Sequence, residues 1–398
     1  MTRPAPARPS PRRRPTLIHL TTTDVSLALL LQPQLRAFAD AGYDVIGMSA
    51  PGPYVDDLTR DGIRHEPVTH FTRRMAPQHD ALALGELWRA FRRLQPDIVH
   101  THNPKPGVLG RLAARSARVP AVVNTVHGLY ALPSDRAAKR WVVYGLERAA
   151  AKCSDAELVQ NVEDVPVLHR LGIRAPKVRL LGNGIDLARF DATAARATRA
   201  AARAELGIDD DDTIVVGAVG RLVAEKGYHE LFAAARALTV TSPKVRLVVV
   251  SLTDVAKSDA ISSTERSEAA AAGVRFLGER RDVERVYAAM DIFVIASWRE
   301  GFSRSGMEAA AMGLPVIATD VRGCRQVVDH ERTGLLIPVR DPDAIADAVR
   351  RLAANADLRR TMGEAGIELA RREFDQRRVI DITLATYAEV LRHEPVPS

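Results

Sequence analysis

Short apolar runs alternate with amphipathic stretches along nearly the whole chain, and this alternation restricts the available folds more than any other feature. Leu84, Leu87, Phe91 and Leu94, for example, recur at helical spacing. Strands that alternate with helices of about 10–15 residues form βαβ units with a parallel sheet. The runs expected to form strands are Thr16–Leu20, Asp44–Ser49, Asp97–Thr101, Ala121–Val126 and Asp155–Gln160, then Thr213–Val219, Val245–Ser251, Val274–Leu277, Asp291–Ala296 and Pro315–Thr319. The two series predict two doubly wound, Rossmann-like α/β domains.

The length of 398 residues suits two domains, and the composition marks their limits. The Pro- and Arg-rich N-terminus has no apolar face to bury, so we expect it to be disordered. The stretch Phe374–Arg392 has helical apolar spacing but no strand after it, so it must dock on an existing domain, and we expect it to return to the first. The expected parts are a disordered basic tail 1–15, an N-terminal domain 16–190, a linker 191–212, a C-terminal domain 213–373 and a crossover helix 374–394.

Composition restricts the cellular location expected for the protein and the classes of molecule that it could bind. No signal-peptide pattern and no run of about 18 apolar residues occurs, which predicts a cytoplasmic protein with at most peripheral contact to the inner face of the cell membrane. Cys153 and Cys324 have no CxxC or metal-ligand spacing. The net charge of +7 suits phosphate-bearing substrates or an anionic membrane. Nucleic acid is not favoured, because aromatic and basic residues are not interleaved.

The segment GRLVAEKG follows the first strand of the second series. Gly220 permits a tight turn, Arg221 and Lys226 place two cations on one strand-to-helix loop, and Gly227 opens the next helix. The positive end of that helix also favours anions. The loop therefore predicts a diphosphate site, with an ordinary charged surface loop as the alternative. It is neither a Walker loop nor a GxGxxG turn.

Two glutamates flank a Ser- and Gly-rich turn in SWREGFSRSGME. Glu308 has a structural alternative, because Ser305-x-x-Glu308 has the spacing of a helix capping box. Glu300 has no such explanation, since it lies on a loop well before the helix expected at Met307–Met312. Sugar hydroxyls are natural donors to carboxylates. One glutamate would bind a sugar and the other a ribose, which predicts a nucleotide-sugar site.

Three histidines in the first series are also candidate functional residues. His100 and His102 lie at i and i+2 on one face of an expected strand, and His127 follows the next strand beside a glycine. A metal site is the alternative, but no acidic ligand cluster accompanies the three rings. For His127 the alternative is a satisfied structural residue, but the adjacent Gly128 and the position at the end of a strand favour a functional role. We expect the segment HNPKPG, which contains His102 and Lys105, to shape an acceptor site, with Lys105 near a phosphate.

The motifs taken in order resemble those of the retaining glycosyltransferases of family 4, of the bacterial polysaccharide type. They are Glu300-x7-Glu308, GRLVAEKG before it, GLPVIATDVRGCRQVV and ERTGLLIPVRDP after it, and PDIVHTHNPKPGVLGRLAA and AVVNTVHGLY in the first half. The resemblance implies the GT-B fold, in which two Rossmann-like domains face a central cleft and a C-terminal helix crosses back to the first domain. It also implies that no metal or other cofactor is needed.

The resemblance implies a role for each matching residue. Arg221 and Lys226 would bind the diphosphate, and Glu300 and Glu308 would be the two glutamates of the EX7E motif, contacting the transferred sugar and the ribose. His127 would face the sugar from the first domain, so the implied catalytic residues are Glu300, His127, Arg221 and Lys226. The other implied donor contacts are Gly220, the backbone amides of Phe302, Ser303 and Arg304, and the wall beside the base that runs from Leu277 to Val283.

Two segments depart from the family pattern. The loop after the first strand reads LTTTDVSL, without the usual Gly-Gly, so Thr21–Asp24 have no assigned role. The segment Ser251–Ala269 lacks the usual glycine after its strand, which leaves the nucleobase open.

The expected reaction is transfer of a hexose or N-acetylhexosamine from a nucleotide-sugar, with UDP-sugars favoured, to a hydroxyl acceptor. A polyprenyl-diphosphate-linked saccharide would suit the Arg-rich segments Phe71–Pro77, Phe91–Arg93 and Arg111–Arg118, which could contact an anionic membrane. The alternatives are transfer to a soluble acceptor, a nucleotide-sugar epimerase of the same fold, and a non-catalytic sugar-nucleotide-binding protein. The epimerase would need an acid/base pair in the first domain, where no candidate pair occurs.

Overall fold

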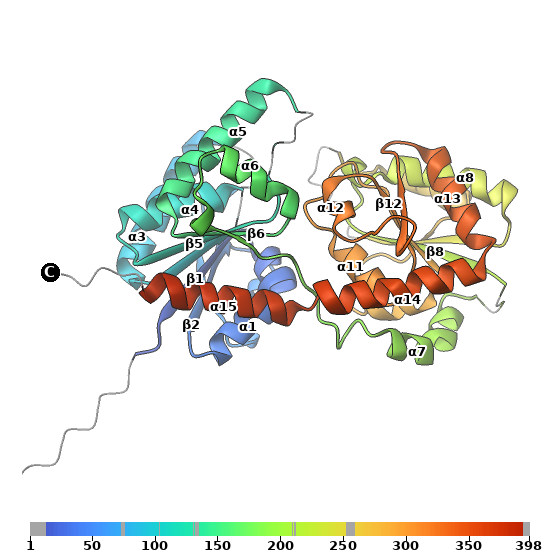
Figure 1. Cartoon of the computed structure of the whole chain (residues 1–398), viewed down its shortest axis with the longest axis horizontal. Coiled ribbons are helices and arrows are strands. Elements are labelled where there is room, and N and C mark those ends of the chain that lie inside the picture. Colours follow the sequence, from blue (N-terminus) through green and yellow to red (C-terminus); the bar gives the residue numbers. More distant parts are fainter. Residues whose placement is uncertain are drawn as a thin grey trace, which may run out of the picture. The chain divides into compact units, whose positions relative to one another are not determined.

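The structure, a computed structural model, describes residues 13–72, 76–102, 104–129, 131, 135–208, 210, 212–251 and 259–392 (Figure 1). The chain forms two compact units. Unit 1 consists of residues 1–159, 167–179 and 380–398, and unit 2 consists of residues 160–166 and 180–379. The expected disordered tail lies outside the described residues as far as residue 12.

Unit 1 is built on a seven-stranded sheet in the order β3-β2-β1-β4-β5-β6-β7, with parallel pairing between the neighbours from β3 to β6. The order reverses between β1 and β4, as in a doubly wound domain. Its strands are β1 (Thr16–Thr23), β2 (Asp44–Ala50), β3 (Arg64–Pro67), β4 (Ile98–His102), β5 (Ala121–Val126), β6 (Ala156–Val159) and β7 (Val178–Leu180). Its helices are α1 (Gln32–Asp40), α2 (Val55–Arg60), α3 (Pro77–Leu94), α4 (Lys105–Ser116), α5 (Ala137–Ala150) and α6 (Val165–Arg170).

Alternation along the strands decides which side chains enter the core of unit 1. Ile18 and Leu20 on β1 and Val99 on β4 point to the face covered by α3 and α4, where Leu87 and Phe91 are buried with them. The other face, by the same alternation, receives His19 and His100, which are directly opposite each other in the register of β1 and β4. One face is therefore apolar, and the other has a polar strip at the point where the strand order reverses.

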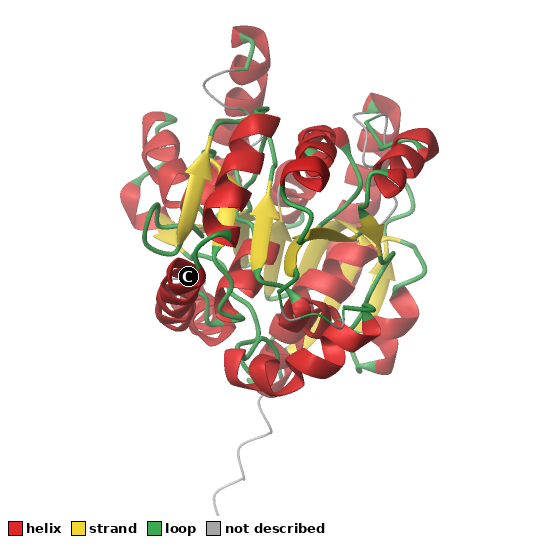
Figure 2. Cartoon of the chain, turned by 90° about the vertical axis from the view of Figure 1, so that its right-hand side faces the viewer, coloured by secondary structure: helices red, strands yellow, loops and turns green. Residues whose placement is uncertain are grey.

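Unit 2 is built on a six-stranded parallel sheet in the order β10-β9-β8-β11-β12-β13, which reverses between β8 and β11. Helices lie along both faces of the strands (Figure 2), and two apolar clusters fill the two sides. The strands are β8 (Ile214–Val219), β9 (Val245–Val250), β10 (Arg275–Phe276), β11 (Ile292–Ile295), β12 (Val316–Thr319) and β13 (Gly334–Ile337). The helices are α7 (Ala192–Glu205), α8 (Tyr228–Thr241), α9 (Ser263–Ala271), α10 (Val283–Ala289), α11 (Arg304–Ala311), α12 (Arg322–Arg325), α13 (Pro342–Ala353) and α14 (Ala356–Glu373).

The expected strands are all present, and β3, β7 and β13 are additional. β3 is polar (RHEP) and β7 has three residues, so neither has enough apolar alternation to stand out. Both are edge strands. β13 (GLLI) follows a turn at residues 331–333 and is too short for its period to separate strand from helix.

The segment expected as a linker, residues 191–212, lies within unit 2. It contains α7, which packs on α10 and whose Arg199 and Arg203 both pair with Asp291. The last helix, α15 (Gln376–Arg392), belongs to unit 2 as far as Val379 and to unit 1 from Ile380 onward. The return of the C-terminal helix to the first domain is therefore confirmed.

Candidate functional site

The loops after β8 and β11 meet in unit 2 through an ion pair. Lys226 Nζ lies 2.5 Å from Glu300 Oε1, and the Ser297 hydroxyl donates to the same oxygen at 2.8 Å. Both charged side chains are mostly shielded from solvent, with 22% of Lys226 and 12% of Glu300 exposed. β8 and β11 are parallel neighbours at the reversal of strand order, which is where ligands bind in open α/β sheets.

Glycine makes this approach of the two loops possible. Gly227 has a φ of +72°, and a Cβ added there would lie 1.9 Å from the carbonyl oxygen of Ala296. The Trp298 amide donates to the Glu225 carbonyl at 2.8 Å, which joins the loops directly. On the other side of Glu300, a Cβ on Gly323 would lie 2.5 Å from the carbonyl oxygen of Glu300. A side chain at either glycine would therefore push the Glu300 loop out of place.

A small cavity adjoins the Lys226–Glu300 pair. It is lined by Gly220, Tyr228, Ser297 and Ser305, among others. The Tyr228 hydroxyl donates to the Gly220 carbonyl at 3.2 Å. Burial, with the charge of Glu300 second, raises the pKa of Tyr228, so the phenol stays protonated as a donor. The sequence predicted Gly220, Lys226 and Glu300, and Arg221 follows Gly220 on the same loop, but Tyr228 and Ser297 were missed.

Glu308 is not part of a capping box, so that alternative is wrong. Helix α11 begins at Arg304 and its N-cap is Ser303, whose Oγ accepts from the Gly306 amide at 3.3 Å. Glu308 is therefore inside the helix. Its Oε2 accepts from the Tyr287 hydroxyl at 3.0 Å, and its Oε1 accepts from Arg304 Nε at 3.0 Å. The helix was placed too late because Ser303 and Ser305 both suit an N-cap.

The environment of Glu308 is unusual for a carboxylate. It is almost completely buried, and burial raises its pKa while Arg304 and Tyr287 act in the opposite direction. Each carboxylate oxygen can accept more than one hydrogen bond, so Glu308 retains acceptor capacity beyond its two protein donors. A buried carboxylate held by a phenol and a guanidinium suits a ligand with paired hydroxyls.

The expected wall beside the base runs between β10 and α10. Leu277 and Val283 are partly buried against the apolar cluster that contains Tyr287. Phe302 packs against the same cluster, with its ring edge-on to Phe374. These side chains therefore act first as packing residues around Tyr287 and Glu308. Within Ser251–Ala269, the second departure from the family pattern, residues 252–258 lie outside the described part of the chain.

A short segment from the first half of the sequence contributes to unit 2. Asn161 Nδ2 donates to the carbonyl oxygen of Gly301 at 2.9 Å, next to Glu300. Glu163 accepts from Arg325 at 3.0 Å, and Asp164 accepts from Arg322, both of which lie on α12. Sequence reasoning missed this segment because the contacts join residues about 140–160 positions apart, and only the fold brings them together.

In unit 1, His127 and His102 are in direct contact. His102 Nδ1 lies 2.8 Å from His127 Nε2, and His102 Nε2 lies 3.0 Å from His19 Nδ1. The candidate ligand atoms of His19, His100 and His102 lie within 4.8 Å of one another, so these three rings could hold a metal ion. Their nitrogens are already engaged in hydrogen bonds within the protein. The absence of a metal cofactor stays a prediction.

Other first-half positions have protein partners. The Lys105 ammonium is buried, 2.6 Å from Asp80 Oδ1 and 3.2 Å from Thr72 Oγ1. In the loop without Gly-Gly, the Asp24 carboxylate accepts from the Tyr54 amide at 2.8 Å. The hydroxyl of Thr21 donates to the carbonyl of Thr23.

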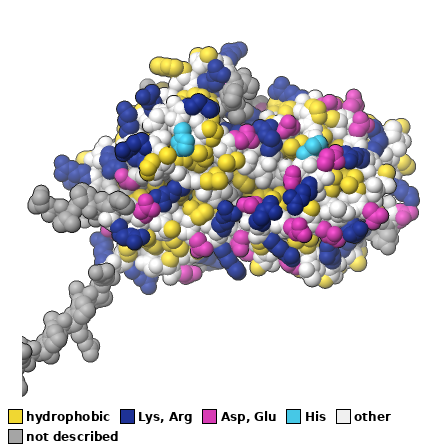
Figure 3. All heavy atoms as spheres, in the orientation of Figure 1, with side chains coloured by type: hydrophobic (Ala, Val, Ile, Leu, Met, Phe, Trp, Pro, Cys, Tyr) yellow, Lys and Arg dark blue, Asp and Glu magenta, His cyan; other side chains and the backbone are white. Residues whose placement is uncertain are grey.

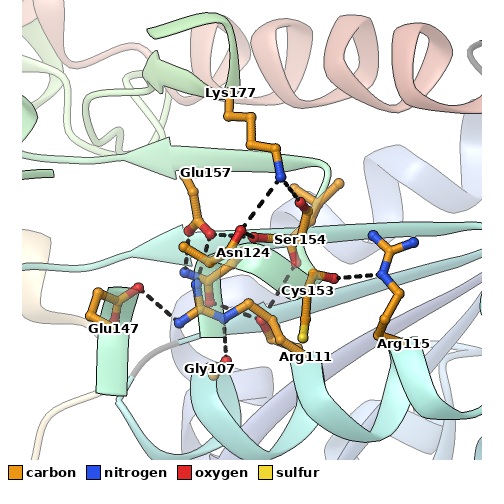
Figure 4. Close-up of polar contacts among 12 residues, drawn as sticks. Gly107, Arg111, Arg115, Asn124, Glu147, Cys153, Ser154, Glu157 and Lys177 are labelled. Carbon is orange, nitrogen blue, oxygen red and sulfur yellow. Dashed lines mark hydrogen bonds and ion pairs between the residues drawn. The ribbon is translucent and has the colours of Figure 1, made fainter. Parts of the chain in front are cut away.

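The expected basic surface over Arg111–Arg118 is partly wrong. Arg111 is completely buried, bonding Glu157 Oε1 at 2.7 Å and Glu147 Oε1 at 2.8 Å (Figure 4). Glu157 also accepts from Asn124 at 2.7 Å and from Ser154. Arg111 therefore ties α4 to β6 and α5. In Phe71–Pro77, residues 73–75 lie outside the described residues.

The chain matches two family descriptions that together cover most of it. "Glycosyltransferase Family 4" matches residues 34–189, and "Glycosyl transferases group 1" matches residues 213–355. The chain is 30% identical over 304 residues to the UDP-Gal:alpha-D-GlcNAc-diphosphoundecaprenol alpha-1,3-galactosyltransferase of Escherichia coli, covering 76% of this chain and 77% of that protein. It is 34% identical over 336 residues to a GDP-mannose-dependent alpha-mannosyltransferase of Mycobacterium tuberculosis, covering 79% and 82%.

Solved structures agree on the architecture. HepE of Anabaena in complex with UDP superposes with a TM-score of 0.78 at 20% identity, covering 94% of this chain and all of that one. Sucrose-phosphate synthase of Thermosynechococcus elongatus superposes with a TM-score of 0.79 at 22% identity, covering 95% and 100%. At these identities the likeness establishes the fold.

Proposed function

Because this chain belongs to glycosyltransferase family 4 and has the GT-B fold, we propose that it transfers a hexose or N-acetylhexosamine, with retention, from a UDP-sugar to a hydroxyl of a lipid-linked saccharide. The observation that carries this proposal is the contact between Lys226 and Glu300, at the carboxyl ends of β8 and β11. A cation for a diphosphate and a carboxylate for sugar hydroxyls lie side by side, as transfer from a nucleotide-sugar requires.

In the proposed reaction, the bond between the anomeric carbon and the diphosphate oxygen breaks, and its electron pair leaves with the diphosphate. Lys226 and Arg221 stabilise the charge that develops there. The acceptor oxygen bonds to the same carbon on the face that the phosphate leaves, and a phosphate oxygen takes the acceptor proton. Glu300 holds the sugar hydroxyls and forms no covalent bond. His127 is proposed to contact the sugar as well.

The donor is proposed to be a UDP-sugar. The Escherichia coli relative is named for UDP-Gal, and HepE was solved with UDP. Glu308, held by Tyr287 and Arg304, is proposed to accept hydrogen bonds from the ribose hydroxyls. Another relative, from Mycobacterium tuberculosis, is named for GDP-mannose. A comparison of UDP- and GDP-sugars therefore tests which nucleobase this chain binds.

The outer face of α5 supports a membrane-bound acceptor. Trp141 is 80% exposed, Val142 is 51% exposed and Leu146 is 42% exposed. At helical spacing these three lie on one arc, with Lys139 at one edge and Arg148 at the other. An apolar stripe that includes Trp and is bordered by cations is typical of helices that lie in the interface of an anionic bilayer. Figure 3 shows hydrophobic and basic side chains together over this helix.

The inner face of α5 is fixed to the domain. Glu147 points inward to the buried Arg111 (Figure 4). The Tyr144 hydroxyl donates to the Ala131 carbonyl at 3.0 Å. None of the described helices is long and apolar enough to cross a membrane. We therefore propose that α5 holds unit 1 on an anionic membrane surface, where a diphospholipid-linked acceptor resides.

Two experiments test the proposal. The first measures thermal shift and slow nucleotide release with a panel of UDP-, GDP- and ADP-sugars; preference for a UDP-sugar supports the assignment, and an epimerised nucleotide-sugar in place of release contradicts it. The second measures flotation with vesicles of phosphatidylglycerol and phosphatidylcholine. Trp141→Ser should reduce binding, whereas Val240→Ser, at another exposed apolar position, should not. Equal binding by both variants would remove α5 from the proposal.

A further inference from the structure

Five consecutive hydrogen bonds join β5 to His127 through the interior of unit 1. Thr125 Oγ1 lies 2.7 Å from His100 Nε2, and His100 Nδ1 lies 2.5 Å from the Tyr387 hydroxyl. That hydroxyl lies 3.1 Å from His19 Nε2. His19 Nδ1 then contacts His102 Nε2 at 3.0 Å, and His102 Nδ1 contacts His127 Nε2 at 2.8 Å. We call this series the histidine chain.

Strand register explains how the histidine chain forms. His19 and His100 are partners across β1 and β4, and His102 and Thr125 are partners across β4 and β5, so their side chains share one face of the sheet. Tyr387 comes from α15, far along the sequence, and its ring packs edge-on to Phe38. The C-terminal helix thus supplies the link between His100 and His19.

The histidine chain is buried and uncharged. His19 and Tyr387 are fully buried, and His100 and His102 nearly so. Burial lowers the pKa of His19 to about 3 and lowers the pKa of His100 and His102 well below the usual range of histidine. Burial also raises the pKa of Tyr387, so its hydroxyl keeps its proton. Each ring between the ends therefore has one N–H donor and one nitrogen acceptor.

These donors and acceptors restrict the positions of the protons in the five hydrogen bonds. Each link needs one proton, because two facing N–H groups or two facing lone pairs would repel. A ring that donates on one side must accept on the other, so the orientation of one link fixes the next. The Tyr387 hydroxyl has one proton, and among the described residues its polar contacts are the two ring nitrogens. If both rings donated to its oxygen, that buried proton would have no acceptor, so the hydroxyl must donate to one ring and accept from the other. Only two orders remain, one with every proton directed toward His127 and one with every proton directed toward Thr125.

We propose that the histidine chain sets the tautomer of His127, and that Tyr387, His19 and His102 are positioning residues for that ring. In one order His127 accepts at Nε2 and has its proton on Nδ1, and in the other order it donates from Nε2 and has a lone pair on Nδ1. Whether Nδ1 carries a proton or a lone pair therefore follows from the order of the protons in the histidine chain. The consequence for catalysis rests on the proposed function, in which His127 contacts the donor sugar.

The tautomer itself can be tested without any assumption about function. Tyr387→Phe keeps the ring that packs on Phe38 and removes only the oxygen between His100 and His19. Tyr43→Phe is the matched control, because Tyr43 contacts the Tyr387 ring but is not in the histidine chain. The readout is the nitrogen-15 NMR signature of the His127 ring in the intact protein, which distinguishes the two tautomers.

We expect a single His127 tautomer in the parent and in Tyr43→Phe, and a mixed or reversed one in Tyr387→Phe. Should Tyr387→Phe fail to fold, Thr125→Val breaks the far end of the histidine chain, and Thr125→Ser should restore the parent signal. An unchanged His127 signal in the folded variants would overturn the proposal. One equivalent of zinc retained on His19, His100 and His102 would also overturn it, because the metal would take the same ring nitrogens.

Turnover of the UDP-sugar separates this inference from the proposed function. Where both hold, Tyr387→Phe lowers kcat by at least about tenfold with little change in the donor KM, because a misoriented catalytic group costs rate more than binding. A changed His127 signal with normal turnover would support the role of the histidine chain in setting the tautomer. It would contradict the role of His127 in the proposed reaction.

Discussion

Lys226→Ala tests the candidate site in unit 2 by removing one charged side chain. The substitution removes the ammonium 2.5 Å from Glu300 and leaves Ser297 as a donor to that carboxylate. Both side chains keep some solvent contact, so the ion pair is expected to contribute only about 1 kcal/mol to the free energy of unfolding. Folding should therefore survive the substitution, and the effect should be confined to the reaction.

The expected effect on turnover is much larger than the effect on stability. A preorganised group that stabilises charge in the transition state typically contributes at least about 100-fold in kcat, or about 2.7 kcal/mol. Release of UDP from the UDP-sugar identified in the panel should fall by at least that factor in Lys226→Ala. The assay is steady-state nucleotide release, with circular dichroism and thermal unfolding measured on the same preparations.

A matched control comes from the same unit. Lys244 pairs with Asp212 at 2.6 Å, away from the loops after β8 and β11, and both side chains are largely exposed. Lys244→Ala should leave turnover unchanged. Near-normal turnover in a folded Lys226→Ala protein would refute the reasoning that this cation stabilises the leaving diphosphate.

The remaining predictions concern packing, electrostatics and metals. Gly227→Ala should lower the free energy of unfolding by at least about 2 kcal/mol more than Gly273→Ala. Both glycines have positive φ, but only a Cβ at Gly227 would lie 1.9 Å from a carbonyl oxygen. Equal losses in urea unfolding would contradict the steric argument. Glu308→Ala should mainly raise the donor KM in steady-state assays, and an unchanged KM would exclude the ribose role. Burial raises the pKa of Glu308 in the folded protein. The free energy of unfolding of the parent, compared with that of Glu308→Gln, should therefore fall as the pH rises from about 4 through that raised pKa. The opposite trend would show that Arg304 dominates. EDTA should leave turnover intact, and loss that a divalent metal restores would contradict a metal-free reaction.

The parallel sheets could be predicted because their signal is local. Each apolar run such as Asp291–Ala296 contains a strand, since burial on both faces of a sheet selects continuous β-branched stretches. The loops after β8 and β11 were predictable for the same reason, since their glycines and charges follow directly after strands. The start of α11 was misplaced by three residues because Ser303 and Ser305 are equally suited to cap it.

Contacts between distant residues could not be predicted from periodicity. Tyr387 reaches His19 across 368 positions, and Asn161 reaches Gly301 across 140. Arg111 had the sequence context of a surface arginine on an amphipathic helix, yet Glu147 and Glu157 bury it. A burial of this kind depends on which carboxylates the fold brings opposite the side chain, and neither the spacing nor the composition contains that information.

The most direct test of the central claim is the anomeric configuration of the sugar that the enzyme releases. Slow hydrolysis of the preferred UDP-sugar, followed by proton NMR before mutarotation, gives that configuration without knowledge of the acceptor. Retaining transfer at the Lys226–Glu300 site predicts that the first-formed sugar has the configuration of the donor, and that Lys226→Ala suppresses its formation. First appearance of the opposite anomer would contradict the account.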